Sequence, residues 1–119
     1  MKRITILEVK FKKIVFFDLS FCPAEEFKDL IEKFFEFVRK HEKKSVRLLI
    51  DLTGLNYIPT DVMYINDRMK QVNEFLKCQA YIGMDGLKKV LWHIFKKNVT
   101  VETKIFDKNE CAINWLISC

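Results

Sequence analysis

The sequence predicts one α/β domain with a mostly parallel sheet, because strand patterns and helix patterns alternate along most of the chain. The clearest strand is a nearly unbroken apolar run over residues 46–52, which is typical of a strand covered on both faces. A polar turn with Gly54 follows it, and Pro59-Thr60-Asp61 then opens a long helical pattern. In open α/β folds, such a loop between a buried strand and a helix N-terminus is where ligands and partners bind.

Two strands are expected before the first helix. Residues 4–11 and 14–19 are rich in β-branched and apolar side chains, with charged residues interspersed. Lys12-Lys13 is the expected two-residue turn between them, although it lacks the Asn-Gly chemistry of a strong hairpin. These segments should therefore form an antiparallel pair at the start of the fold.

The first helix is the clearest amphipathic segment of the chain. Pro23 suits the first turn of a helix, and Glu25 and Glu26 suit its positive end. Apolar residues then recur at spacings of three and four, at Phe27, Leu30, Ile31, Phe34, Phe37 and Val38. This spacing predicts a helix that packs one face on the sheet.

The rest of the chain continues the alternation. We expect a strand over 46–52, a helix capped by Thr60, a strand over 79–84, a helix from 87, a strand over 99–106 and a last helix over 112–117. The expected buried stripe of the second helix is Val62, Ile65, Met69, Val72 and Leu76. The predicted order is β-β-α-β-α-β-α-β-α, with about four helices in a single domain over residues 1–119.

Composition narrows the classes of function. The chain has 119 residues, half of them apolar, which is enough to bury a core without disulfides or metals. Its net charge is +5, but lysines and arginines are interleaved with 16 acidic residues along helical faces. That pattern indicates a solvated surface, and no nucleic-acid-binding motif is present, so we expect no nucleic-acid partner.

The four cysteines indicate a reducing compartment. Cys22, Cys78, Cys111 and Cys119 form no C-x-x-C pair and lie far from both histidines in sequence, so no metal site is expected. The N-terminus reads as a strand rather than a signal peptide, and no apolar run is long enough to span a bilayer. We therefore expect a cytoplasmic protein with reduced thiols and no membrane span.

Four segments of the chain carry a family resemblance. They are IVFFDLS at 14–20, VRLLIDLT at 46–53, AYIGMDGLKK at 80–89 and FDKNECAINWL at 106–116. In order and spacing the chain resembles the SpoIIAA-like superfamily. That group holds the STAS domains (sulfate transporter and anti-sigma factor antagonist) and, by related fold, the Sec14 or CRAL-TRIO lipid-binding domains. The resemblance implies a SpoIIAA-like (STAS-like) fold and a non-enzymatic regulatory or protein-interaction role.

The resemblance also implies a candidate phosphorylation site. Aligning Asp51-Leu-Thr-Gly54 with the family's D-L-S-G element places Thr60 opposite the serine that is phosphorylated in some STAS domains. Pro59 and Val62 stand where the family motif has Asp and Gly. The plain alternative is that Thr60 caps the second helix and Asp61 favours its dipole.

The segment over residues 54–64 and the outer face of the second helix are the expected partner-binding surface. Asp61 and Met63 lie there, and Tyr64 and Phe75 are expected to point the same way as an exposed aromatic pair, which suits an interface hot spot. The alternative is that the two rings pack against a neighbouring loop. The partner would be another protein or a second copy of the chain.

The loop over residues 83–89 is a second candidate site. Gly83 and Gly86 permit close backbone approach, and Lys88 and Lys89 follow in the first turn of a helix, so an anion such as a phosphate head group could bind. The alternative is a tight turn that needs positive φ at Gly86. This loop, or a pocket lined by the many phenylalanines, would serve a small anionic or lipid ligand.

Catalysis is not expected. No cysteine has an evident histidine partner, and no cofactor motif is present. Asp18 and Asp51 end neighbouring predicted strands and could meet as a carboxylate pair, or they could bind loop amides. We expect a protein without catalytic residues or a cofactor.

Overall fold

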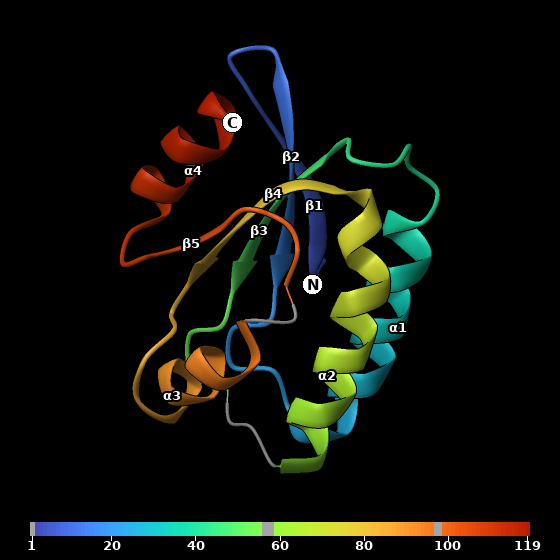
Figure 1. The fold of residues 1–119 in the computed structure, drawn as a ribbon, viewed down its shortest axis with the longest axis vertical. Helices are drawn as coiled ribbons and strands as arrows, with labels where there is room; N and C mark the ends of the chain where they lie inside the picture. The colour runs from blue at the N-terminus through green and yellow to red at the C-terminus, as the bar shows by residue number, and fades with distance from the viewer. Residues whose placement is uncertain (1, 56–58, 97–98) are drawn as a thin grey trace.

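The computed structural model describes residues 2–55, 59–96 and 99–119, without the side chains of 59–62, 87, 91, 94 and 95. Its elements in chain order (Figure 1) are β1 Ile4–Val9, β2 Lys12–Asp18, α1 Ala24–Val38, β3 Val46–Asp51, α2 Pro59–Val72, the 3₁₀ helix η1 Asn73–Phe75, β4 Leu76–Ile82, α3 Gly86–Phe95, β5 Thr103–Phe106 and α4 Asn109–Ser118. Within the described ranges, no helix combines the length and apolar character needed to cross a bilayer.

The five strands form one mixed sheet in the order β1-β2-β3-β4-β5. β1 pairs antiparallel with β2, and β2, β3, β4 and β5 run parallel to one another. This arrangement confirms the predicted class, an α/β fold with an N-terminal antiparallel pair and four α-helices in the described chain. It also places the starts of β2, β3 and β4 at one edge of the sheet and their carboxyl ends at the other.

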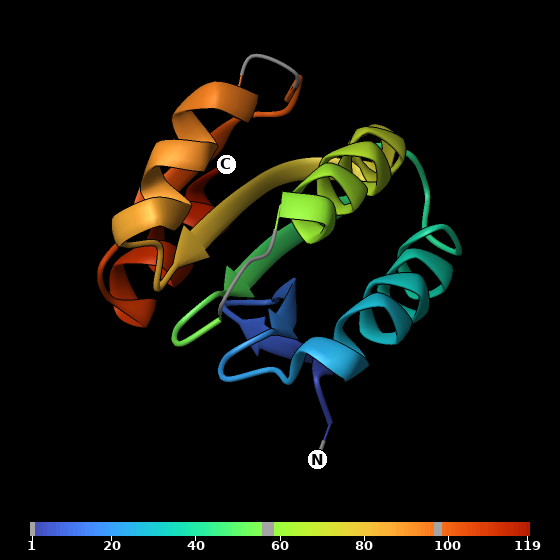
Figure 2. The ribbon, with the colours of Figure 1, turned by 90° about the horizontal axis from the view of Figure 1, so that it is seen from below.

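Helices cover the sheet on both faces. α1 and α2 lie side by side on one face (Figures 1 and 2), over an α1–α2 core that includes Phe17, Phe27, Phe34, Leu48, Ile50 and Val72. α4 covers the other face over an α4 core of Ile14, Leu49, Cys78, Ala80, Ile82, Ala112 and Leu116. The apolar run of β3 is explained by these two cores, because successive side chains enter opposite ones.

The turn between β1 and β2 is not where the sequence suggested. Lys10 and Phe11 occupy it, with φ of 50° and 66°, while Lys12 and Lys13 are already paired with Val9 and Glu8 in the sheet. The expected turn at Lys12-Lys13 was therefore wrong. A two-residue hairpin loop favours positive φ at both central residues because of the strand twist, and here neither is the glycine or asparagine that would have marked it.

Other element boundaries differ by a few residues. α2 begins at Pro59, which suits the first helical position, so Thr60 lies inside the first turn and is not the cap that we expected. The second helical pattern ends at Val72, where η1 takes over, and β4 starts at Leu76 rather than at residue 79. Phe75 consequently belongs to η1 rather than to α2.

Candidate functional site

The candidate site is the edge of the sheet where β2, β3 and β4 end. Asp18, Asp51 and Ile82 are neighbours across these three strands, because Asp18 is in register with Asp51 and Asp51 with Ile82. The connections that leave the strands here are residues 19–23, 52–58 and 83–85. Carboxyl ends of parallel strands are the usual location of a site in an open α/β sheet.

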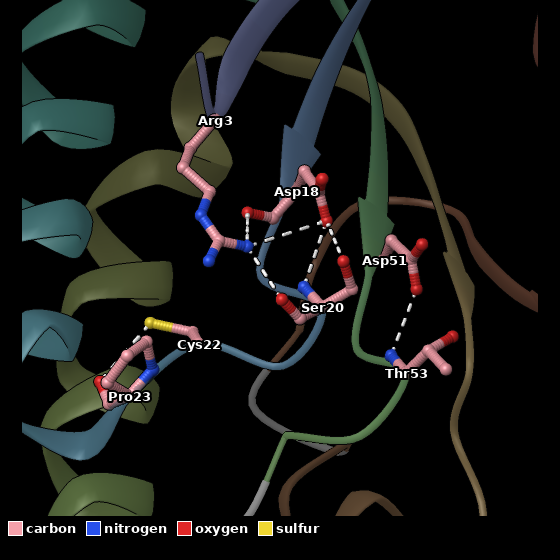
Figure 3. A network of polar contacts seen from close by, with 7 residues as sticks. All are labelled: Arg3, Asp18, Ser20, Cys22, Pro23, Asp51 and Thr53. Atoms are coloured by element: carbon pink, nitrogen blue, oxygen red, sulfur yellow. Dashed lines mark hydrogen bonds and ion pairs between the residues drawn. The ribbon is translucent and has the colours of Figure 1, made fainter. Parts of the chain in front are cut away.

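Asp18 is used to shape the first of these connections (Figure 3). Its Oδ1 accepts hydrogen bonds from the Ser20 amide at 2.9 Å and from the Ser20 hydroxyl at 2.5 Å. Arg3 Nη1 donates to the Ser20 carbonyl at 2.6 Å and lies 3.8 Å from Asp18 Oδ1. The Arg3 guanidinium therefore links the start of the chain, just before β1, to the turn that follows β2.

Asp51 has the same role at the end of the neighbouring strand. Its Oδ1 accepts a hydrogen bond from the Thr53 amide at 2.9 Å (Figure 3). Both carboxylates thus bind loop amides, the alternative that the sequence left open for them, rather than converging as an acid/base pair. The two turns are also joined by backbone bonds, from the Leu19 amide to the Asp51 carbonyl at 2.9 Å and from the Phe21 amide to the Thr53 carbonyl at 2.8 Å.

Phe21 stands out at this edge, and the sequence analysis missed it. Its side chain is 72% exposed, and its backbone has a φ of 52°. The ring lies directly against Gly54, where an added Cβ would come within 2.3 Å of Phe21 Cδ1. A large aromatic in the left-handed region is an outlier. The sequence signal was a phenylalanine between Ser20 and Cys22-Pro23, in the short connection from the second predicted strand to the first predicted helix.

The third connection packs tightly on the second. Gly83 has a φ of 73°, and a Cβ there would lie 2.3 Å from the Thr53 amide nitrogen and 2.4 Å from Thr53 Oγ1. Gly86 has a φ of 49° but open space around it, which fits the tight-turn alternative for the 83–89 loop. Gly83 therefore serves contact between the two loops.

Lys88 has a structural role in this loop. The side chain is buried, and its Nζ donates to the Leu52 carbonyl at 2.8 Å and lies 3.2 Å from Asp85 Oδ1. The ammonium ties the first turn of α3 to the end of β3. Of the two lysines predicted to bind an anion, only Lys89 is exposed to solvent.

The expected aromatic pair on the outer face of α2 is not formed. Tyr64 is partly buried against the α1–α2 core, with Lys28 Nζ 5.6 Å and Arg68 Cζ 6.0 Å from its ring centroid. Phe75 also packs against this core, from η1. The expectation of exposure was wrong because α1 lies beside α2 and covers the side of the helix that carries Tyr64.

Among the predicted partner-binding residues whose side chains are described, Met63 is the one exposed to solvent, at 57%. Thr60 and Asp61 lie in the first turn of α2, but their side chains fall outside the described residues. Residues 56–58 of the 54–64 segment also fall outside the described residues.

The hydroxyl of Tyr64 is affected by its surroundings. Burial raises the pKa of this hydroxyl, and the nearby Glu32 carboxylate acts in the same direction.

The thiols at and near the site do not have the properties of nucleophiles. Burial raises the pKa of Cys22, whose Sγ lies 3.4 Å from the Pro23 carbonyl (Figure 3), and burial raises that of Cys78 in the α4 core. A reactive cysteine needs a lowered pKa. Among the residues that the structure describes, histidine, cysteine and carboxylate side chains form no group of three that could hold a metal ion.

Neither a protein-family model nor a curated protein matches this sequence, but solved structures match the fold. One is an uncharacterised protein of the DUF3478 family with a SpoIIAA-like fold from Shewanella loihica PV-4. It is 18% identical, with a TM-score of 0.71 over 95% of this chain and 91% of that one.

The second is an anti-sigma-factor antagonist (STAS) domain protein from Planctomyces limnophilus. It is 13% identical, with a TM-score of 0.57 over 93% of this chain and 96% of that one. The chain therefore has the SpoIIAA-like fold, shared with STAS domains, that its four sequence segments implied.

Proposed function

We propose that this chain is a non-enzymatic regulatory or protein-interaction module. The docking surface would be the carboxyl edge of the sheet, comprising Phe21, the 54–64 segment and Met63 on α2. The observation that carries the proposal is Phe21, a 72% exposed aromatic ring seated on Gly54. An exposed aromatic that rests on a rigid backbone can serve as an interface anchor, because little side-chain freedom is lost when a partner covers it.

The polar groups at the same edge favour binding over chemistry. Asp18 and Asp51 each accept hydrogen bonds from loop amides, and the ammonium of Lys88 bonds the Leu52 carbonyl. A general base or a nucleophile must instead be free to reach a substrate. The edge therefore resembles a rigid binding platform, with its charged groups holding the loops in place.

One structural neighbour supports this proposal. The protein from Planctomyces limnophilus is described as an anti-sigma-factor antagonist (STAS) domain protein. The partner proposed here is a protein or a second copy of the chain, with the cytoplasm as the proposed location. Phosphorylation of Thr60 and a small anionic or lipid ligand at the 83–89 loop remain predictions.

The test is native mass spectrometry of the protein purified from its own host, in parallel with variants. Wild type should carry a stoichiometric protein partner, or form a homodimer, and Phe21→Ala with Met63→Ser should release it. Ile6→Thr is the matched control, since Ile6 is 50% exposed but lies on β1, away from this edge.

Three results would change the proposal. A partner that survives the double variant would move the docking surface elsewhere. A retained small molecule in place of a protein would favour the ligand-binding alternative. A phosphate adduct that maps to Thr60 would add the regulatory switch to the module.

A further inference from the structure

The tip of the β1–β2 hairpin has a second exposed phenylalanine. Phe11 is 96% exposed and has a φ of 66°, next to Lys10 with a φ of 50°. The loop stands clear of the rest of the molecule at the top of Figure 1. It precedes β2, whereas Phe21 follows β2, so the two rings lie at opposite ends of one strand and at opposite edges of the sheet.

Folding alone does not account for an aromatic at this position. A two-residue hairpin loop with positive φ is satisfied best by asparagine or glycine, and a bulky side chain there is strained. Because nearly the whole ring is in contact with water, it buries little apolar surface and does not stabilise the fold. Strained, exposed residues concentrate at functional sites. We therefore expect a binding partner to cover this ring.

Basic residues predominate at this end of the sheet. The hairpin has Lys10, Lys12 and Lys13 against one acidic residue, Glu8. The connection from α1 to β3 brings Arg39, Lys40, Lys43 and Lys44, against Glu42, to the same edge. The two segments share an edge because β2 and β3 are parallel, with Ile14 in register with Arg47. A positively charged edge is the complement of an anionic surface.

Some of these cationic side chains form hydrogen bonds or ion pairs within the chain, and others do not. Lys12 Nζ donates to the Ile117 carbonyl at 2.6 Å, Lys43 lies 3.8 Å from Glu74, and Arg39 lies 2.9 Å from Glu36. Lys10, Lys13, Lys40 and Lys44 are exposed and form no ion pair within the described residues. Their four charges are available to a partner.

We propose that the hairpin tip docks on an anionic lipid bilayer. Phe11 would enter the interface between head groups and acyl chains, and Lys10, Lys13, Lys40 and Lys44 would face the lipid phosphates. A bilayer fits better than an acidic protein, because a protein partner needs about 800 Å² of complementary surface on each side. A convex tip with one projecting ring offers far less than that, whereas a fluid interface can accept a single aromatic together with cations from two neighbouring loops.

Co-sedimentation with vesicles tests this proposal. The full chain should bind phosphatidylcholine vesicles that contain phosphatidylglycerol, bind pure phosphatidylcholine much less, and release as salt increases. Phe11→Gly should weaken binding by about tenfold or more, since a buried phenylalanine side chain is lost. Lys10→Gln with Lys13→Gln should weaken it by about fivefold for each charge removed.

Glycine is chosen at position 11 because it relieves the positive φ, so the variant should unfold at a temperature equal to or above that of wild type. A loss of binding then cannot come from a loss of folding. Phe21→Gly is the matched control, because it removes a similarly exposed, positive-φ phenylalanine from the other edge and should leave vesicle binding unchanged.

The proposal is overturned by equal binding to neutral vesicles, by Phe11→Gly binding as wild type does, or by no vesicle binding at all. Binding to poly-glutamate without binding to vesicles would assign the tip to an acidic protein. Partner binding at the Phe21 edge is measured separately, so either proposal can fail while the other holds.

Discussion

At the scale of single residues, Gly83 and Gly86 separate two reasons for glycine. Both have positive φ, but only Gly83 has a backbone neighbour where a Cβ would go, 2.3 Å away at Thr53. Gly86→Ala should therefore cost only the left-handed strain, about 1 kcal/mol of unfolding free energy. Gly83→Ala should cost clearly more, about 2 kcal/mol or above, because the two loops must also move apart.

Urea denaturation of both alanine variants measures this difference. Equal losses of stability would mean that the 83–85 loop yields without resistance and that its contact with Thr53 is not needed. A larger loss in Gly83→Ala, together with weaker binding of the protein partner, would tie the geometry of the loop to the docking edge.

Sequence reasoning located the edge better than it located the residues that form its surface. Asp18 and Asp51 could be placed at strand ends, and their binding of loop amides was anticipated, because both facts follow from local sequence. The exposure of Phe21 and the burial of Lys88 could not be anticipated. Both depend on contacts between loops from different strands, at Gly54 and at the Leu52 carbonyl.

At the scale of elements, α4 is held to the sheet by cations at its C-terminus. Arg47 on β3 donates from Nε to the Leu116 carbonyl at 3.0 Å and from Nη2 to the Cys119 carbonyl at 3.2 Å. Lys12 on β2 donates to the Ile117 carbonyl at 2.6 Å. The Leu116 carbonyl also accepts a long bond from the Cys119 amide at 3.4 Å, and all three carbonyls lie at the C-terminal end of α4. Positive charge at a helix C-terminus is favourable.

Arg47→Met should destabilise the chain by about 2 kcal/mol and speed amide exchange in α4, because two charge-assisted hydrogen bonds are lost. The Leu116 carbonyl keeps its long bond from the Cys119 amide, and the Cys119 carbonyl loses the Arg47 donor. Hydrogen–deuterium exchange over α4 is the measurement. Lys12→Met is the control, since its hydrogen bond is exposed and should matter less. Unchanged exchange in Arg47→Met would show that apolar packing alone holds the helix.

Most elements were predictable because each has its own periodicity or apolar run. The hairpin turn was not, because Lys10-Phe11 has no turn chemistry in its letters and is set by the register between β1 and β2. The orientation of Tyr64 was also not predictable. Helical spacing gives a direction around α2 but not the neighbour that lies there, and α1 covers that direction.

At the scale of the whole molecule, the two edges of the sheet differ in chemistry. The carboxyl edge has Asp18, Asp51 and Asp85 with the loops around Phe21, and the amino edge has the lysine-rich hairpin with Phe11. Because both phenylalanines flank the rigid strand β2, a chain docked through one edge would present the other outward. Together, the two proposed surfaces would let the chain bring a protein partner to a membrane surface.

The two cores on either face of the sheet should unfold together, as the prediction of a single domain over residues 1–119 requires. Each core has a tryptophan of its own: Trp92 contacts the α1–α2 core, with its ring 5.5 Å from Tyr81, and Trp115 contacts the α4 core, with its ring 5.9 Å from Phe106. Trp92→Phe and Trp115→Phe therefore leave one fluorescent reporter on each side of the sheet.

Because β3 contributes Leu48 to one core and Leu49 to the other, neither core can open without exposing the shared strand. After correction for the small stability change of each variant, the two fluorescence transitions in urea should coincide with each other and with the loss of helical circular dichroism. An earlier transition for Trp115 alone would show that α4 leaves the sheet first. The cations that hold its C-terminus would then be its main attachment, and Arg47→Met should widen the gap between the two transitions.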